Sequence, residues 1–593
     1  MKKGLILLLY ISFIGSIFSQ TKPPKKKKSE KIDTVKTEVV EVVSKYNAKV
    51  ADANKIRKSP IIEVSDKNKR KKLSYTIYSA PVASTFTPKT GALKGIDIGL
   101  KEELHKNYLA LGYGNYNSPF AELYIHKNKK FDEEYGVKAK YLASLNDIQN
   151  TELNSTFSNF LSSVFYKKDE RYFNWKVSLD GEIYKYNWYG LSNNNFIAST
   201  LNSIDEKQNY TYLKAAGEID LFDAYIDNSV LSISHFSDNF QSKEFIANLE
   251  TNFDIPIDFI SRQLDDLIVK TNFEYLSGEF ERDYATLNKV DYSIFTANIN
   301  PEYKSEFSGF SYKIGASFFA SFDTENKLNN FLIYPDVLIN KSISNEKFNF
   351  YTGINGNLTT NTFKSFSDKN PYVSPTLFIT QTSKKYDAFL GTNGIINNEL
   401  SFNISTNIKE EEDKPFFVKN NSKSDGTNTS LNGESLLGYE YGNSFNVVYD
   451  DVKTISVRAE LEYELSNKIS SKINFEYYNY ETTNQTEAWN LPNIKGDFSL
   501  KYKTVKWYAA TNIFYVGERK DLLFTSIYPS ISNGIQTLDA FVDINLDGGY
   551  HFNDKFSVFL QFNNLLNQNY QRFLNFDVQG FQVLGGVTYK FDF

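Results

Sequence analysis

The chain has 593 residues, 16% of them aromatic, and a formal net charge of −5. Beyond the first twenty residues no stretch approaches the roughly 18 consecutive apolar residues of a membrane-spanning helix, which excludes a helical membrane protein. Gly (30) and Pro (14) are too few, and Phe and Tyr too many, for a disordered or collagen-like chain. Cysteine is absent and the four histidines are scattered, so we expect no enzyme, no cofactor and no metal site.

The first segment, residues 1–19, has the pattern of a cleaved secretory signal. Lys2 and Lys3 precede an apolar run, and small residues lead to Gln20, which we expect to be the first mature residue. The run is too short for an anchor helix, and no cysteine follows it to carry a lipid. The sequence therefore predicts an exported protein.

Residues 20–90 are predicted to be a basic periplasmic tail. Between residues 20 and 75 there are 15 Lys and 2 Arg against 7 acidic residues, whereas residues 76–593 carry a net charge of −17. The simpler interpretation is an ordinary flexible tail. The alternative is that the tail docks on or inside the acidic remainder of the chain. It would then reach into or across the periplasmic mouth of the β-barrel that residues 91–593 are predicted to form. Nucleic-acid binding is not expected, because no DNA- or RNA-binding module accompanies the basic runs.

From about residue 91 onward the chain alternates with a period of two, as β-strands do. Between residues 455 and 465 apolar side chains alternate with Ser456, Arg458, Glu460 and Glu462. About 500 residues of this pattern without linkers exceed a soluble sandwich. We therefore predict an all-β fold: a large transmembrane antiparallel β-barrel of about 22 strands over residues 91–593, with apolar faces toward outer-membrane lipids. The candidate lumen-lining residues are Arg458, Glu460, Glu462, Asp543, Asn545 and Asp547.

Loop lengths indicate the same architecture. Tight turns near residues 466–467, 504 and 553–554 alternate with long loops at 481–496, 517–536 and 567–580. Outer-membrane barrels have short periplasmic turns and long extracellular loops. The alternation predicts a protein of the cell outer membrane with its amino and carboxyl termini in the periplasm.

The last strand resembles the carboxy-terminal assembly signal of Gram-negative outer-membrane proteins. One face carries apolar side chains, the other face carries Thr588, Lys590 and Asp592, and the chain stops on an aromatic residue. The resemblance implies that the barrel-assembly machinery is a partner. The residues of the predicted signal are Val587, Tyr589, Phe591 and Phe593.

The segment from Phe541 to Phe573, with its Asn564-Leu565 pair and Tyr570, resembles the closing hairpins of TonB-dependent receptors, whose barrels have twenty-two strands. Residues 75–89 resemble the start of a group of such barrels from Bacteroidetes. Members of that family carry a glycine-rich amino-terminal plug, but only about 70 residues, mostly charged, precede the first strand here. The sequence thus predicts a plugless barrel that does not contact TonB.

Two functions remain open. The first is transport, either nutrient uptake or a passive pore, with the lumen blocked by the tail or by inward-folded loops. The alternative is a scaffold barrel, a subunit of a larger envelope complex that docks surface lipoproteins. Asp543, Asn545, Asp547, Gly548 and Asp554 partly match a calcium loop, but the alternation of the first three with apolar residues favours a strand.

Overall fold

The computed structural model describes residues 106–593, apart from 130–131, 193–195, 223, 258–266, 344–346, 525–531 and 593. The predicted signal peptide, the tail, the start of the barrel at residue 91 and Phe593 lie outside these residues. No helix in the described part of the chain is long and apolar enough to cross a membrane.

Twenty-two strands form one sheet in which neighbours are antiparallel. The first eleven are β1 (Asn107–Gly114), β2 (Ser118–Lys129), β3 (Glu133–Ser144), β4 (Phe157–Asp169), β5 (Phe173–Asn187), β6 (Lys207–Leu221), β7 (Ile226–Ser237), β8 (Lys243–Ile255), β9 (Leu267–Phe280), β10 (Val290–Phe307) and β11 (Phe310–Asp323). The others are β12 (Leu328–Ile343), β13 (Phe348–Thr360), β14 (Gln381–Asn397), β15 (Leu400–Lys419), β18 (Phe445–Ser466), β19 (Ile469–Thr482), β20 (Ile494–Lys503), β21 (Trp507–Val516), β24 (Phe541–His551), β25 (Phe556–Asn563) and β28 (Gln582–Phe591).

The sheet closes on itself. Each strand pairs with the next along the chain, and β1 pairs with β28 in a register that places Leu111 opposite Val587. Closure leaves no strand edge, which is the condition for a β-structure to span a membrane. The predicted antiparallel barrel is confirmed, with 22 strands.

The strands present two different faces, as the period of two predicts. On β18, Ile455 is 48% exposed and Val457 and Leu461 are also exposed, whereas Thr454 on the opposite face is fully buried. Large exposed apolar side chains recur on the same face of other strands, including Phe295, Ile333 and Ile404. This face is apolar enough to meet lipid, and the other face lines the interior.

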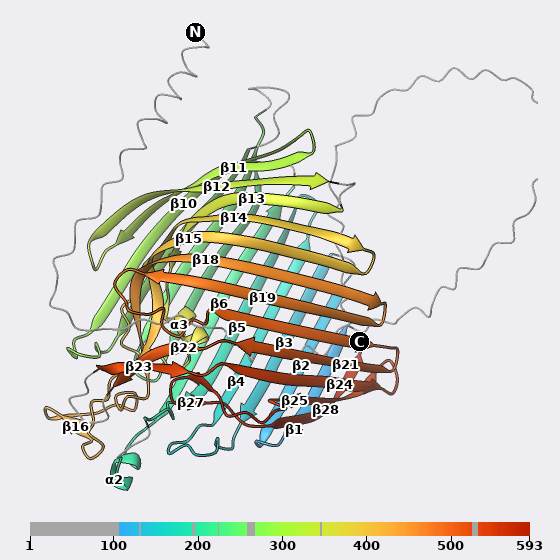
Figure 1. The fold of residues 1–593 in the computed structure, drawn as a ribbon. Coiled ribbons are helices and arrows are strands. Elements are labelled where there is room, and N and C mark those ends of the chain that lie inside the picture. The colour runs from blue at the N-terminus through green and yellow to red at the C-terminus, as the bar shows by residue number, and fades with distance from the viewer. Residues whose placement is uncertain are drawn as a thin grey trace, which may run out of the picture.

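The two ends of the barrel differ in their connections. At one end, called here the turn end, β14 and β15 are joined by residues 398–399 and β18 and β19 by residues 467–468. At the other, the loop end, lie the long connections, such as residues 361–380, 420–444 and 517–540, and in Figure 1 these gather toward the lower left. The predicted turns at 466–467, 504 and 553–554 correspond to connections at 467–468, 504–506 and 552–555, which confirms the alternation.

Several loops at the loop end contain structure of their own. The β21–β24 loop holds the hairpin β22 (Arg519–Phe524) and β23 (Ser532–Leu538), so the loop runs to residue 540 and not to 536 as predicted. The remaining elements are helices α2 (Ala198–Leu201) and α3 (Phe363–Lys369) and the short strands β16 (Ser430–Leu431), β17 (Glu434–Ser435), β26 (Gln571–Phe573) and β27 (Phe576–Asp577).

Candidate functional site

Loops from opposite walls of the barrel meet in one apolar core at the loop end. The loops are 188–206, 361–380, 420–444 and 564–581, and we call their joint structure the loop cap. β5 and β15, which lead into two of these loops, stand ten positions apart in the ring of 22 strands. The loops therefore reach across the mouth. Buried members of the core from the loops include Trp188, Tyr189, Phe363, Phe366, Val373, Leu377, Tyr439, Tyr441, Phe573 and Phe576.

Aromatic rings hold the centre of the cap. Tyr372 stacks on Phe576 with ring centroids 3.8 Å apart, and Tyr189 lies against both rings at 5.7 and 5.0 Å. Trp188 packs edge-on against Tyr439 at 5.3 Å. Such pairs contribute about 0.5–1.5 kcal/mol beyond the burial of their area. Four loops distant in sequence are thus joined by direct ring contacts.

Helix α3 carries one of these loops to the far wall. Thr362 caps the helix. Its side chain accepts a hydrogen bond from the Ser365 N–H, and the Ser365 hydroxyl oxygen accepts one from the Thr362 N–H. The side chain of Phe363 is fully buried, with its ring 5.6, 5.1 and 5.0 Å from the rings of Tyr210, Phe236 and Phe280 on β6, β7 and β9. The helix is seven residues long, so these distant contacts stabilise it more than its own propensity does.

A buried carboxylate on β8 binds the start of this helix. Glu244 is 1% exposed and accepts the backbone N–H groups of Phe363 at 2.6 Å and of Lys364 at 3.0 Å. The Tyr292 hydroxyl donates to the same carboxylate at 3.0 Å. The carboxyl oxygens of Glu244 accept from N–H groups at the helix N-terminus that the helix itself cannot satisfy. Glu244 therefore fastens α3 to the barrel wall.

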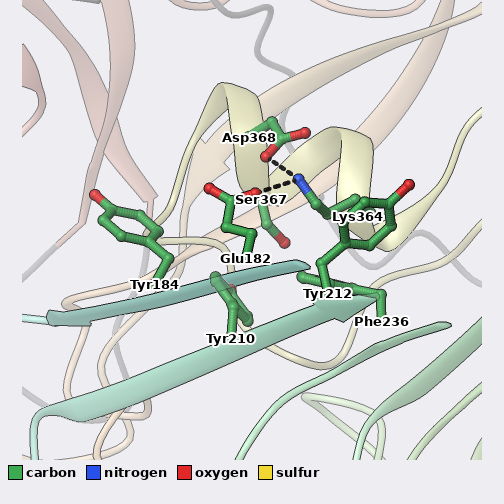
Figure 2. A pocket seen from close by; sticks show the side chains of 8 residues that line it. All are labelled: Glu182, Tyr184, Tyr210, Tyr212, Phe236, Lys364, Ser367 and Asp368. Atoms are coloured by element: carbon green, nitrogen blue, oxygen red, sulfur yellow. Dashed lines mark hydrogen bonds and ion pairs between the residues drawn. The ribbon is translucent and has the colours of Figure 1, made fainter. Parts of the chain in front are cut away.

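Lys364 makes the second attachment. Its ammonium group lies 2.6 Å from the Asp368 carboxylate and 3.2 Å from that of Glu182 on β5, and 4.8 Å from the Tyr212 ring centroid (Figure 2). Burial opposes its charge, but Asp368 and Glu182 outweigh burial and raise the pKa of Lys364 above its usual value. The pocket around it has a volume of only about 10 Å³, room for roughly one water. This is a closed contact and not a ligand site.

Charged groups also link other loops of the cap. The buried Glu440 carboxylate accepts from Arg282 at 2.6 Å and from Lys423 at 2.7 Å, which joins the β9–β10 loop to the β15–β18 loop. Lys419, buried at the end of β15, donates to the Gly190 carbonyl at 3.1 Å and to the Asn575 side chain. Such contacts fix which loop meets which.

The predicted lumen residues fall into two separate groups. Toward the turn end, Arg458 donates to Glu476 at 2.9 Å and Lys472 bonds Glu460 at 2.6 Å, while Glu462 lies opposite Ser401. Near the loop end, Asp543 accepts from the Tyr570 hydroxyl at 2.7 Å, Asn545 accepts from the Asn564 N–H at 3.2 Å, and Asp547 pairs across to Gln561. All six stand on the face opposite the exposed apolar side chains. That these six residues line an open passage remains a prediction.

The predicted assembly signal lies on the sealing strand β28. Val587 and Tyr589 are exposed, and Phe591 stacks on Tyr589 with ring centroids 6.0 Å apart. The sequence reasoning missed α3, Glu244 and Lys364. The Thr362 to Ser365 spacing was the available signal for the helix, but a partner 119 residues away on β8 leaves no local mark.

No protein-family model matches the chain, and no curated protein matches it. Solved structures do. The pyoverdine outer membrane receptor FpvA from Pseudomonas aeruginosa is 12% identical with a TM-score of 0.59, covering 83% of this chain and 79% of the receptor. The siderophore receptor PirA from Acinetobacter baumannii is 12% identical (TM-score 0.58, covering 82% of this chain and 80% of PirA). The FrpB iron transporter from Neisseria meningitidis is 9% identical (TM-score 0.58, covering 82% of each chain).

At these identities the likeness concerns the fold. The chain shares with these outer-membrane proteins a closed 22-strand antiparallel barrel.

Proposed function

We propose that the protein is an outer-membrane barrel of the TonB-dependent receptor type with a role in transport, whose lumen is closed at the loop end by its own loops. The loop cap carries this proposal, because its apolar core unites loops from opposite walls. The solved structures that share the fold include receptors and an iron transporter, which supports a transport role. With the turn end in the periplasm, the cap faces the cell exterior.

The part of the cap best suited to open is the 361–380 loop. Two polar attachments, at Glu244 and at Lys364, and the buried ring of Phe363 hold α3 to the far wall. Hydrogen bonds exchange with water at a small net cost, so moving α3 costs chiefly the exposure of its apolar side chains, at about 25 cal/mol per Å². A solute would therefore pass by displacement of α3, while the other loops stay packed.

Conductance in planar bilayers tests the closure. The full chain is compared with a variant in which residues 361–380 are replaced by a short Gly-Ser linker, and with a control that shortens the exposed β16–β17 tip at residues 430–435. We expect no steady conductance from the full chain and the control, and an open channel from the linker variant. An open channel from the full chain, or a silent linker variant, would contradict the proposal.

The basic tail, residues 20–90, is proposed to reach into the mouth at the turn end. β1 begins at this end, where the Lys106 N–H donates to the Asp592 carboxylate at 2.8 Å. The tail's positive charge complements the acidic remainder of the chain. The loop cap closes the mouth at the loop end, so the full chain is expected to show no conductance that the tail could change. Residues 20–90 are therefore deleted in the linker variant. We expect the deletion to raise its conductance; an unchanged value would refute the role of the tail.

A second candidate function is a scaffold that docks surface lipoproteins. The size of the apolar core favours it, because a cap packed like a domain interior suits permanent closure. Pull-down from native outer membranes separates the two functions. Stoichiometric co-purification with other envelope proteins would favour the scaffold, and isolation of the barrel alone would favour transport.

A further inference from the structure

A second, larger cavity lies among the loops at the loop end. Its volume is about 370 Å³, within the range of pockets that bind small molecules. Three loops of the loop end form it, those that follow β3, β5 and β25. The described residues that line it are Asn150, Thr151, Glu152, Tyr189, Leu191, Ser192, Phe196, Leu201, Gln571, Asn575 and Asp577.

The lining combines apolar side chains with hydrogen-bond acceptors and two carboxylates. Tyr189 and Leu191 are buried, and their side chains join the apolar core of the cap. The carboxylates of Glu152 and Asp577 have no hydrogen bond or ion pair to another residue in the described part of the chain, and no lysine or arginine is among the described lining residues. Lys419 donates to the side chain of Asn575, which belongs to this lining, and to the Gly190 carbonyl. The charged side chains among the described lining residues are therefore the two carboxylates, and the cavity presents negative charge.

We infer that this cavity binds a small organic cation that carries hydrogen-bond donors, such as an amine or guanidine compound. Its ammonium or guanidinium groups would pair with Glu152 and Asp577, while the amide side chains accept its remaining N–H groups. Apolar carbons would lie against Leu191 and the rings of Tyr189 and Phe196, which also attract cations. An anion would be repelled by both carboxylates.

The cavity is connected to the centre of the cap through Tyr189. The Tyr189 hydroxyl donates to the Asp577 carbonyl at 2.8 Å and lies 3.3 Å from the Tyr372 hydroxyl on the 361–380 loop. A bound cation would therefore contact a ring that also touches the proposed moving loop. That the ligand is a transported solute rests on the proposed function, whereas its binding does not.

Calorimetric titration of the full chain in detergent tests the inference. The probes are agmatine as the cation, sorbitol as the neutral compound and succinate as the anion. Agmatine should bind, and Glu152→Gln and Asp577→Asn should each weaken it about fivefold, since a partly exposed ion pair contributes up to about 1 kcal/mol. Glu325→Gln, at an exposed position in the β11–β12 connection of the same end, should not change binding.

Three results would overturn the inference: no heat from agmatine, tighter binding of succinate or sorbitol, or equal agmatine affinity in the two cavity variants and the Glu325 control. Circular dichroism and heat-modifiable migration confirm that each variant is folded. Binding is measured without any conductance, so a failure here is distinct from a failure of the closure proposal.

Discussion

At the scale of single residues, the buried carboxylate of Glu244 decides whether α3 stays on the barrel wall. It accepts two backbone N–H groups and the Tyr292 hydroxyl, and no other described residue accepts from those two N–H groups. The alternation of β8 could predict that Glu244 faces the interior. It could not predict that a helix arriving from β13 would meet it, because that contact depends on the path of a long loop.

Removal of this carboxylate should release the helix. Glu244→Ala leaves two N–H groups and a hydroxyl unpaired, which costs about 2–4 kcal/mol of local stability. We expect faster amide hydrogen exchange across residues 362–370. Glu250→Ala, at an exposed position on the same face of β8, is the control and should leave exchange unchanged. Equal exchange in both variants would show that Glu244 does not hold α3.

Asp238, in the β7–β8 loop, should make part of the stability depend on pH. Burial raises the pKa of Asp238 to about 6, although its carboxylate accepts from Phe240, Ser242 and Gln208. The unfolded value is about 3.9, so between these values the folded state binds the proton more tightly and stability falls as pH rises, by at most about 3 kcal/mol. The contribution is fully present below about pH 4 and lost above about pH 6.

Asp238→Asn imitates the protonated form at every pH. In guanidinium unfolding we expect the variant to exceed the wild-type chain by about 2 kcal/mol at pH 7.5 and by much less at pH 4.5. All other groups titrate alike in the two proteins, so the difference isolates Asp238. A difference that does not change with pH would contradict the assignment.

At the scale of elements, the strands can be predicted from the sequence and the loop cap cannot. The turn at 467–468 and the strand from Phe556 to Asn563 are local patterns, so the period of two and the turn residues predict them. Phe363, Tyr439 and Phe576 lie in loops far apart in the chain, and their joint core exists only after the barrel has brought those loops to one end. Sequence reasoning could name inward-folded loops as one way to close the lumen, but not which loops.

The buried ring of Phe363 should be the main apolar anchor of α3. Phe363→Ala removes contacts with three rings on the far wall and costs about 3–5 kcal/mol. In planar bilayers we expect brief openings that the wild-type chain does not show. Lys369→Ala, at an exposed position of the same helix, should remain closed. If both variants stay closed, the helix is not the element that opens.

At the scale of the whole molecule, the two faces of the sheet explain how an aromatic-rich chain can also be polar. β1 and β28 seal the ring, so every strand has one face outside and one inside. Val457 and Ser456 are neighbours on β18, yet the first shares the exposed apolar face and the second the face of Arg458 and Glu460. Lipid contact on the first face is the premise of the proposed location in the outer membrane.

A matched pair of lysines tests that premise. Val457→Lys places a charge in hydrocarbon, at a cost of about 2–4 kcal/mol near the bilayer midplane, whereas Ser456→Lys places it inside beside Tyr478. We expect denaturant unfolding in lipid vesicles to show a loss for the first variant and little change for the second. Both variants are measured in vesicles of the same lipid composition, so that the thickness of the bilayer is the same in each. Equal losses would mean that the apolar face does not meet lipid, and the barrel would then have to bury that face against protein.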